Sequence, residues 1–277
     1  MPEKRENAMK DYCLELASKK TDFGAKLNVM REYLQAYILK IMRDEGLFRY
    51  AAFLGGTALR FLYGLPRFSE DLDFSLVKSG EYNFSSLMQR IKEELLLAGY
   101  DVSLTYSDDK NVHSAFVRFI GLMYEAGISP LKSQKFSIKV EIDTLPPKGE
   151  VLTTEIVNKY FPVAFLSYDL PSLLSGKLHA LLSRKYTKGR DFFDLGWYLS
   201  RWKGISPNIT LLHNALKQTG WKKELLDEKN WRDFIYDVVK KADWKKVTED
   251  AQNFLENPSD MNIFSQGNML KLIKGKI

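Results

Sequence analysis

A glycine pair between an apolar run and a helix-forming run is the feature that most limits how this chain can fold. Residues 51–54 are apolar and predict a short buried strand, and residues 57–63 have helical composition. Gly55 and Gly56 stand between them, where they permit a tight turn and a close approach of the backbone to a ligand. A helix that begins at this turn directs its free backbone N–H groups outward, and such groups bind phosphate. The pattern therefore predicts a strand, a turn and a helix with a phosphate site at the turn.

The next segment supplies paired carboxylates. Asp71 and Asp73 are two residues apart, so on an extended strand both side chains point to the same face. Leu72 and Phe74 then point to the opposite face, into a core. Two neighbouring carboxylates repel each other, and a bound divalent cation relieves that repulsion. We interpret the two segments together as a nucleotide site with its metal ligands.

These residues resemble a known signature. They are similar to the signature of the DNA polymerase β-like nucleotidyltransferase superfamily. The matching pattern is Gly-Gly-Thr at residues 55–57, then a short helix, then Arg-x-Ser-x-Asp-Leu-Asp-Phe at residues 67–74. Within it, the flanking Arg67 and Ser69 point to the AbiEii/AbiGii toxin group of bacterial toxin–antitoxin and phage-defence systems. The resemblance covers roughly residues 45–200.

A third acid is expected on a later strand, because the resemblance implies one. Residues 136–143 alternate between apolar and polar side chains, and the polar face carries Glu141 and Asp143. We prefer Glu141, which lies in the middle of the predicted strand, beside the expected place of Asp73, and keep Asp143 as the alternative. The competing interpretation is the solvated face of an edge strand, where an acid binds nothing.

The C-terminal half carries a second group of charged residues. On one continuous helix Lys177 and Arg184 stand seven residues apart and nearly on one face, where they offer two cations to a triphosphate. We expect Gly189 to interrupt this helix before the next one begins. The resemblance makes Lys177 a ligand of nucleotide phosphates and Asp191 a candidate base. The alternative is a basic helix face, with Asp191 as a simple N-cap and Asp194 in the first turn.

The pattern along the rest of the chain predicts an α+β fold. Helical periodicity recurs over residues 25–43, 84–98, 170–182, 192–202, 209–219, 231–242 and 244–255. Runs rich in β-branched and aromatic residues predict strands at 100–106, 115–123 and 135–143. Asp169 caps the first of the C-terminal helices, with Pro171 in its first turn. These elements predict a mixed sheet with antiparallel outer strands, flanked by helices and followed by a helical bundle.

With the resemblance, the pattern predicts two domains. A polymerase β-like nucleotidyltransferase domain is expected over residues 1–165, and a helical domain over residues 166–277 is expected to contribute Lys, Arg and Asp residues to its cleft.

Composition limits the class of protein. Hydrophobic residues make up 45% of the 277, enough for a substantial core, and the net charge of +6 favours polyanionic partners. A single cysteine, Cys13, excludes an intramolecular disulfide and a zinc site built on a cysteine cluster. No apolar stretch approaches the roughly 20 residues of a membrane span, and no apolar run follows the charged first residues. We therefore expect a cytoplasmic protein with no membrane partner.

The resemblance implies a role for each group of residues. The catalytic residues would be Asp71, Asp73, Glu141, Lys177 and Asp191, of which the first three would hold Mg²⁺ or Mn²⁺. The nucleoside triphosphate would be held by Gly55, Gly56, Thr57, Arg67, Ser69, Lys177 and Arg184. Arg67 and Ser69 either brace the acidic strand or touch the nucleotide.

The expected reaction is transfer of a nucleotide to an acceptor with release of pyrophosphate. For the toxin group, the resemblance implies an RNA acceptor, with the acceptor end of tRNA favoured, and a block of translation. It also implies a separately encoded antitoxin. Transfer to a hydroxyl of a protein or small molecule remains an alternative. A metal-dependent nuclease would also use clustered acids, but it does not need the Gly-Gly-Thr turn.

Overall fold

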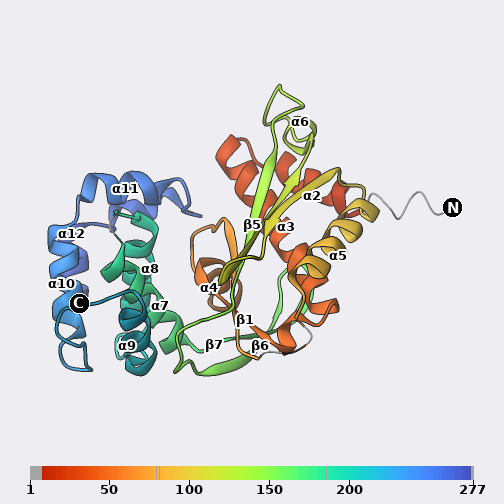
Figure 1. Cartoon of the computed structure of the whole chain (residues 1–277). Coiled ribbons are helices and arrows are strands. Elements are labelled where there is room, and N and C mark those ends of the chain that lie inside the picture. The colour runs from red at the N-terminus through yellow and green to blue at the C-terminus, as the bar shows by residue number, and fades with distance from the viewer. Residues whose placement is uncertain (1–7, 79, 81, 185, 276–277) are drawn as a thin grey trace. The chain divides into compact units, whose positions relative to one another are not determined.

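The computed structural model describes residues 8–78, 80, 82–184 and 186–275 (Figure 1). The chain divides into two compact units. The first comprises Met1–Leu62, Ser69–Leu145 and Thr154–Ser167, and the second Tyr63–Phe68, Pro146–Thr153 and Tyr168–Ile277. None of the helices in the described part of the chain combines the length and hydrophobicity that crossing a membrane requires.

A mixed sheet forms the centre of the first unit. Its seven strands follow the order β3-β4-β5-β2-β1-β7-β6. Their bounds are β1 Ala51–Leu54, β2 Asp71–Leu76, β3 Val102–Ser107, β4 Val112–Phe119, β5 Phe136–Asp143, β6 Leu152–Asn158 and β7 Pro162–Tyr168. Strand β2 pairs antiparallel with β1 and parallel with β5, whereas β4 pairs antiparallel with both β3 and β5. The predicted α+β class and mixed sheet are therefore confirmed.

Helices cover the apolar face of the central strands. The helices of this unit are α2 (Ala8–Ser18), α3 (Phe23–Asp44), α4 (Gly55–Tyr63), α5 (Phe84–Leu97) and α6 (Leu122–Glu125), with a short 3₁₀ helix at Leu47–Arg49. Leu34 and Ile38 of α3 and Ile91 of α5 join one buried core with Phe53 of β1 and Phe74 of β2. Because side chains alternate along a strand, this core leaves the acids of β2 and β5 on the opposite face.

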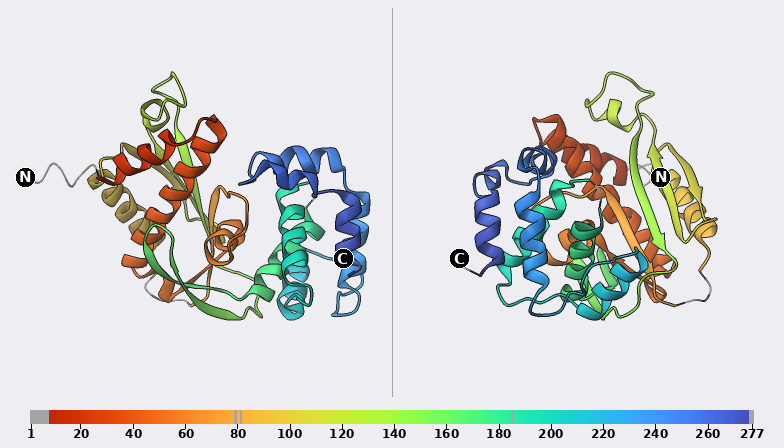
Figure 2. Two further views of the ribbon diagram at one scale, coloured as in Figure 1. Left: turned by 180° about the vertical axis from the view of Figure 1, so that it is seen from behind. Right: turned by 60° about the vertical axis from the view of Figure 1, so that its left-hand side comes forward.

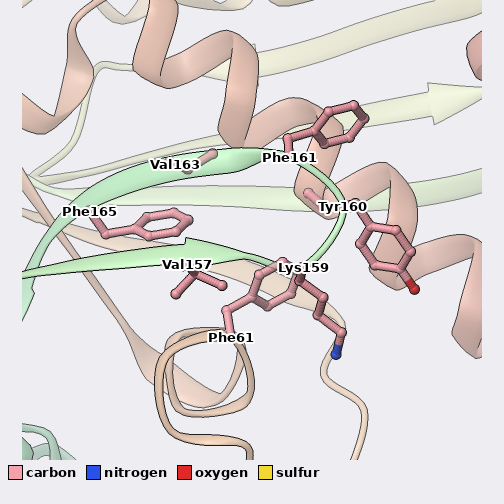
Figure 3. A pocket seen from close by; sticks show the side chains of 8 residues that line it. Phe61, Val157, Lys159, Tyr160, Phe161, Val163 and Phe165 are labelled. Carbon is pink, nitrogen blue, oxygen red and sulfur yellow. The ribbon is translucent and has the colours of Figure 1, made fainter.

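Helix α4 is held in place by a buried charge cluster and by apolar packing. Glu32 of α3 contacts the Arg60 guanidinium of α4 and lies 2.9 Å from Nζ of Lys159. Burial alone would raise the pKa of Glu32, but Arg60 and Lys159 hold it below its usual value. Beside this cluster, Phe61 of α4 and Phe165 of β7 line a small pocket, and Lys159 lies at its rim (Figure 3). These contacts fix the helix whose first residues form the glycine turn.

The second unit is mainly helical (Figure 2). Its helices are α7 (Leu170–Ser183), α8 (Gly189–Arg201), α9 (Ile209–Gln218), α10 (Trp231–Lys241), α11 (Trp244–Gln252) and α12 (Gln266–Ile273), with a 3₁₀ helix at Pro258–Asn262. Asp169 caps α7 by accepting a hydrogen bond from the Ser172 N–H, and Pro171 lies in the first turn. Both features confirm the sequence prediction.

Several elements differ from the sequence prediction. Strand β4 ends at Phe119, not at residue 123, because Gly121 adopts φ +73° and begins the short helix α6. Strands β6 and β7 were not predicted. Strand β6 alternates exposed and half-buried side chains, so its sequence lacks a continuous apolar run. Helices α2 and α12 were also missed.

Candidate functional site

The glycine turn joins β1 directly to α4. Gly55, the first residue of the helix, has φ +82°, a conformation that favours glycine. A methyl group at this position would lie 2.2 Å from Oδ2 of Asp73, so the turn also needs glycine for space. Thr57 is buried, and its hydroxyl donates a hydrogen bond to the backbone carbonyl of Asp71. Thr57 therefore ties the start of β2 to the helix.

The acids of β2 and β5 lie side by side. Asp73 is opposite Glu141 in the parallel pairing of these strands, and Asp73 is also opposite Leu54, the last residue of β1. The three carboxylates of Asp71, Asp73 and Glu141 thus belong to one face of the sheet, at the end of β1 where the glycine turn begins. The predicted position of Glu141 beside Asp73 is confirmed.

Glu141 takes part in an ion pair on its own strand. Its Oε1 lies 2.7 Å from Nζ of Lys139, two residues earlier on the same face. Three carboxylates are a donor set that suits Mg²⁺ or Mn²⁺. In the described part of the chain, however, no three His, Cys, Asp or Glu side chains converge closely enough to hold a metal ion. A metal at this face would therefore need a rearrangement of side chains.

Asp143, the alternative third acid, lies farther along β5. It is opposite Ser75, and its Oδ1 accepts a hydrogen bond of 2.9 Å from the Leu145 N–H. Burial raises the pKa of Asp143, although the Leu145 N–H acts in the opposite direction. This carboxyl group serves the turn that ends the strand.

Replacing Gly55 tests the turn. We expect Gly55→Ala to remove most of the nucleotidyl transfer that the sequence resemblance implies, because the new methyl group pushes the Asp73 carboxylate aside. The positive φ alone should cost about 1–2 kcal/mol of stability. The matched control is Gly64→Ala, since Gly64 has φ +72° but no neighbouring atom within 4 Å of the added methyl group. Equal activity losses in both variants would show that backbone strain alone, and not displacement of Asp73, is responsible.

A second charged cluster lies wholly within the second unit. The guanidinium of Arg67 makes a two-pronged contact with the Asp194 carboxylate, with Nη2 at 2.6 Å from Oδ2. Nζ of Lys177 lies 2.6 Å from Oδ2 of Asp194 and 3.2 Å from Oδ1 of Asp191. Arg184 contacts the other oxygen of Asp191. Two carboxylates are therefore shared among three cations.

The charged groups of this cluster are buried, so each of them needs a partner of opposite charge. Asp194 is 0% exposed, Arg67 is 2% exposed and Asp191 is 3% exposed. Burial alone would raise the pKa of Asp194, but Arg67 and Lys177 together hold it below its usual value. Correspondingly, burial opposes the charge of Arg67, while Asp194 keeps the pKa of the guanidinium above its usual value. Asp194 and Arg67 therefore hold each other in their charged forms.

The local geometry corrects one sequence prediction. Lys177 and Arg184 do not share a continuous helix, because α7 ends at Ser183 and Arg184 is its C-cap with ψ 138°. Gly189 does not interrupt that helix but begins α8. A methyl group there would lie 2.0 Å from the Val247 carbonyl oxygen, so this glycine permits the close packing of α8 against α11. Both cations nevertheless reach Asp191.

The remaining predicted residues have structural partners. Arg67 belongs to the buried cluster of the second unit, and the bridge between Arg67 and Leu255 adds a backbone pairing within that unit. Ser69 is buried, and its carbonyl oxygen accepts a hydrogen bond of 3.1 Å from Nε2 of Gln35. Arg67 is thus tied to the second unit, whereas the Ser69 carbonyl ties the segment before β2 to α3.

Sequence reasoning missed Asp194 and Lys139. Asp194 was considered only as a helix-end residue, yet it is the common partner of Arg67 and Lys177. Its spacing of three from Asp191 places both on one face of α8, which was the available signal. Lys139 stands two residues before Glu141, so the alternation of β5 already placed the two on one face.

Comparison with known proteins identifies the family. The sequence profile described as "Nucleotidyl transferase AbiEii toxin, Type IV TA system" matches residues 37–265, which is most of the chain. The chain belongs to the AbiEii toxin family. It is therefore a nucleotidyltransferase toxin of a type IV toxin–antitoxin system, with a nucleoside triphosphate as substrate and an antitoxin as partner.

Two solved structures share the fold. The crystal structure of JHP933 from Helicobacter pylori has a TM-score of 0.51 and 20% identity, over 89% of this chain and 88% of that one. A "putative nucleotidyltransferase" from H. pylori has a TM-score of 0.53 and 19% identity, over 90% of this chain and 92% of that one. No curated protein sequence matches the chain. The fold shared with these two structures therefore extends over most of the chain.

Proposed function

We propose that this AbiEii toxin transfers a nucleoside monophosphate from a nucleoside triphosphate to RNA, with the acceptor end of tRNA as the favoured target, and so blocks translation. The observation that carries the proposal is the shared face of Asp71, Asp73 and Glu141 beside the turn at Gly55. The net charge of +6 suits a polyanionic acceptor.

The first unit would bind the triphosphate and the metal. The free N–H groups at the start of α4, at Gly55 and Gly56, are suited to phosphate oxygens. Asp71, Asp73 and Glu141 would hold Mg²⁺ or Mn²⁺. When bound, the metal would lower the pKa of the acceptor hydroxyl and neutralise charge on the triphosphate and the departing pyrophosphate. Thr57 would keep β2 in register with the turn through its hydrogen bond to Asp71.

The helical domain predicted over residues 166–277 would contribute its own charged residues. Lys177 and Arg184 would contact phosphate oxygens, and Asp191 would accept the proton of the acceptor hydroxyl. Arg184 now pairs with Asp191, so a phosphate that draws Arg184 away would leave that carboxylate more available as a base. Asp194 would hold Lys177 in position throughout, because this carboxylate is fixed by Arg67.

A labelling experiment tests the acceptor. The purified protein is incubated with Mg²⁺, total tRNA and each α-labelled nucleoside triphosphate in turn, with Asp73→Ala alongside, and RNA and protein are resolved on a denaturing gel. We expect label on tRNA with the unmodified protein only, and the productive triphosphate names the preferred nucleotide. Label on protein would show that the acceptor is a protein and not RNA, and shortened RNA would indicate a nuclease. Unlabelled, intact RNA would contradict transfer to tRNA.

A further inference from the structure

One cation stands among the acids of the first unit. The parallel register of β2 and β5 places Asp71 opposite Lys139 and Asp73 opposite Glu141. Because residues two apart on a strand share a face, all four side chains belong to the same face of the sheet. Nζ of Lys139 lies 2.7 Å from Oε1 of Glu141. The Lys139 ammonium therefore lies among the three acids to which the proposed function assigns metal binding.

The charge of Lys139 is coupled to more than one of these acids. The strand register places Lys139 directly opposite Asp71, and its ammonium also pairs with Glu141. Its side chain is 31% exposed, and its Nζ lies 5.9 Å from the ring centre of Phe116 on β4. Because this side chain is partly exposed, the ammonium can turn from Glu141 toward solvent.

We propose that Lys139 is a built-in competitor of the divalent metal, and that it raises the metal concentration at which the carboxylate site fills. A metal held by Asp71, Asp73 and Glu141 needs the Glu141 carboxylate, which Lys139 now engages, and a dication repels the ammonium. Lys139 must therefore turn away as the metal binds. This inference rests on the proposed metal site.

Metal binding can be measured without any reaction. The full chain is titrated with Mn²⁺, and the free ion is followed by electron paramagnetic resonance at constant ionic strength. We expect Lys139→Gln to bind Mn²⁺ about twofold to fivefold more tightly than the unmodified protein, the range typical of a partly exposed ion pair. Lys139→Arg keeps a cation at this position and should retain the weaker affinity.

Two controls separate this inference from the proposed function. Lys110→Gln removes one positive charge from an exposed position of the same unit and should leave the affinity unchanged. Asp73→Ala should lose the Mn²⁺ site. If the unmodified protein binds Mn²⁺ but Lys139→Gln binds it equally or more weakly, competition is overturned while the metal site stands. If the unmodified protein binds no more Mn²⁺ than Asp73→Ala, the proposed metal site and the inference both fail.

Discussion

We expect Asp73→Ala to lower nucleotidyl transfer at least about a hundredfold, in line with the loss of an electrostatic contact to a transition state. Asp73 lies opposite Glu141 and next to the glycine turn, so it is the acid best placed between the metal and the triphosphate. Its removal deletes one of three like charges on a single face. The fold should therefore survive, and the circular dichroism spectrum and melting temperature should stay near those of the unmodified protein.

Matched variants on β5 sharpen this prediction. Glu141→Gln should lose activity as Asp73→Ala does, since both remove a proposed metal ligand. Asp143→Asn should keep most of the activity, because the asparagine oxygen can still accept the hydrogen bond from the Leu145 N–H. Initial rates of label incorporation provide the measurement. Retained transfer by Asp73→Ala would contradict the assignment of Asp73 as a metal ligand. An inactive Asp143→Asn together with an active Glu141→Gln would contradict the choice of Glu141 as the third acid.

The second large effect is on stability. We expect Asp194→Asn to lower the free energy of unfolding by about 3–5 kcal/mol, because Arg67 would keep a buried charge without its carboxylate and Lys177 would lose one of its two carboxylate partners. All five tryptophans belong to the second unit, so intrinsic fluorescence during urea unfolding reports on that unit. Asp237→Asn on the exposed face of α10 is the matched control and should change stability by less than about 0.5 kcal/mol.

A double-mutant cycle identifies the cause of this loss. Arg67→Met combined with Asp194→Asn should cost less than the sum of the two single variants, because the double variant no longer leaves Arg67 as an unpaired buried charge. Additive losses would show that the two residues do not interact. A loss below about 1 kcal/mol in Asp194→Asn would mean that the buried cluster contributes little to the second unit.

The pKa shift of Asp194 also fixes the direction of a pH effect. Its folded-state pKa is lowered, so the stability it contributes is complete above the unfolded-state value of about 3.9 and is lost as pH falls through the folded value. The stability difference between the unmodified protein and Asp194→Asn should therefore be constant near neutral pH. It should shrink only as the pH falls below about 4.

The sequence predicted those parts of the fold that depend on neighbouring residues. The apolar run at 51–54, the glycine pair and the alternation of β5 each depend on residues close in the chain, and each gave the correct element. Glu141 could be placed beside Asp73 because strand alternation constrains both. The edge strand β6 was not predicted, since half of its side chains face solvent and no apolar run marks it.

The ion pairs of the charged cluster in the second unit were not predicted, for a different reason. Arg67 and Asp194 are 127 residues apart, so their pairing is decided by tertiary structure and leaves no local pattern. Lys177 and Arg184 were predicted as partners of a phosphate, and the sequence could not show that Asp191 and Asp194 already engage them. The same residue types serve an ion-pair network and a phosphate site, so only coordinates reveal their present partners.

The way the chain is divided between the two units limits which segments recombination can exchange between related toxins. Tyr63–Phe68 and Pro146–Thr153 belong to the second unit although both precede its helices in the sequence. A fragment that begins at residue 166 would leave Asp194 without Arg67 and Leu255 without its bridge partner. A single recombination event between two relatives therefore cannot exchange the helical unit intact, because its three segments would have to move together.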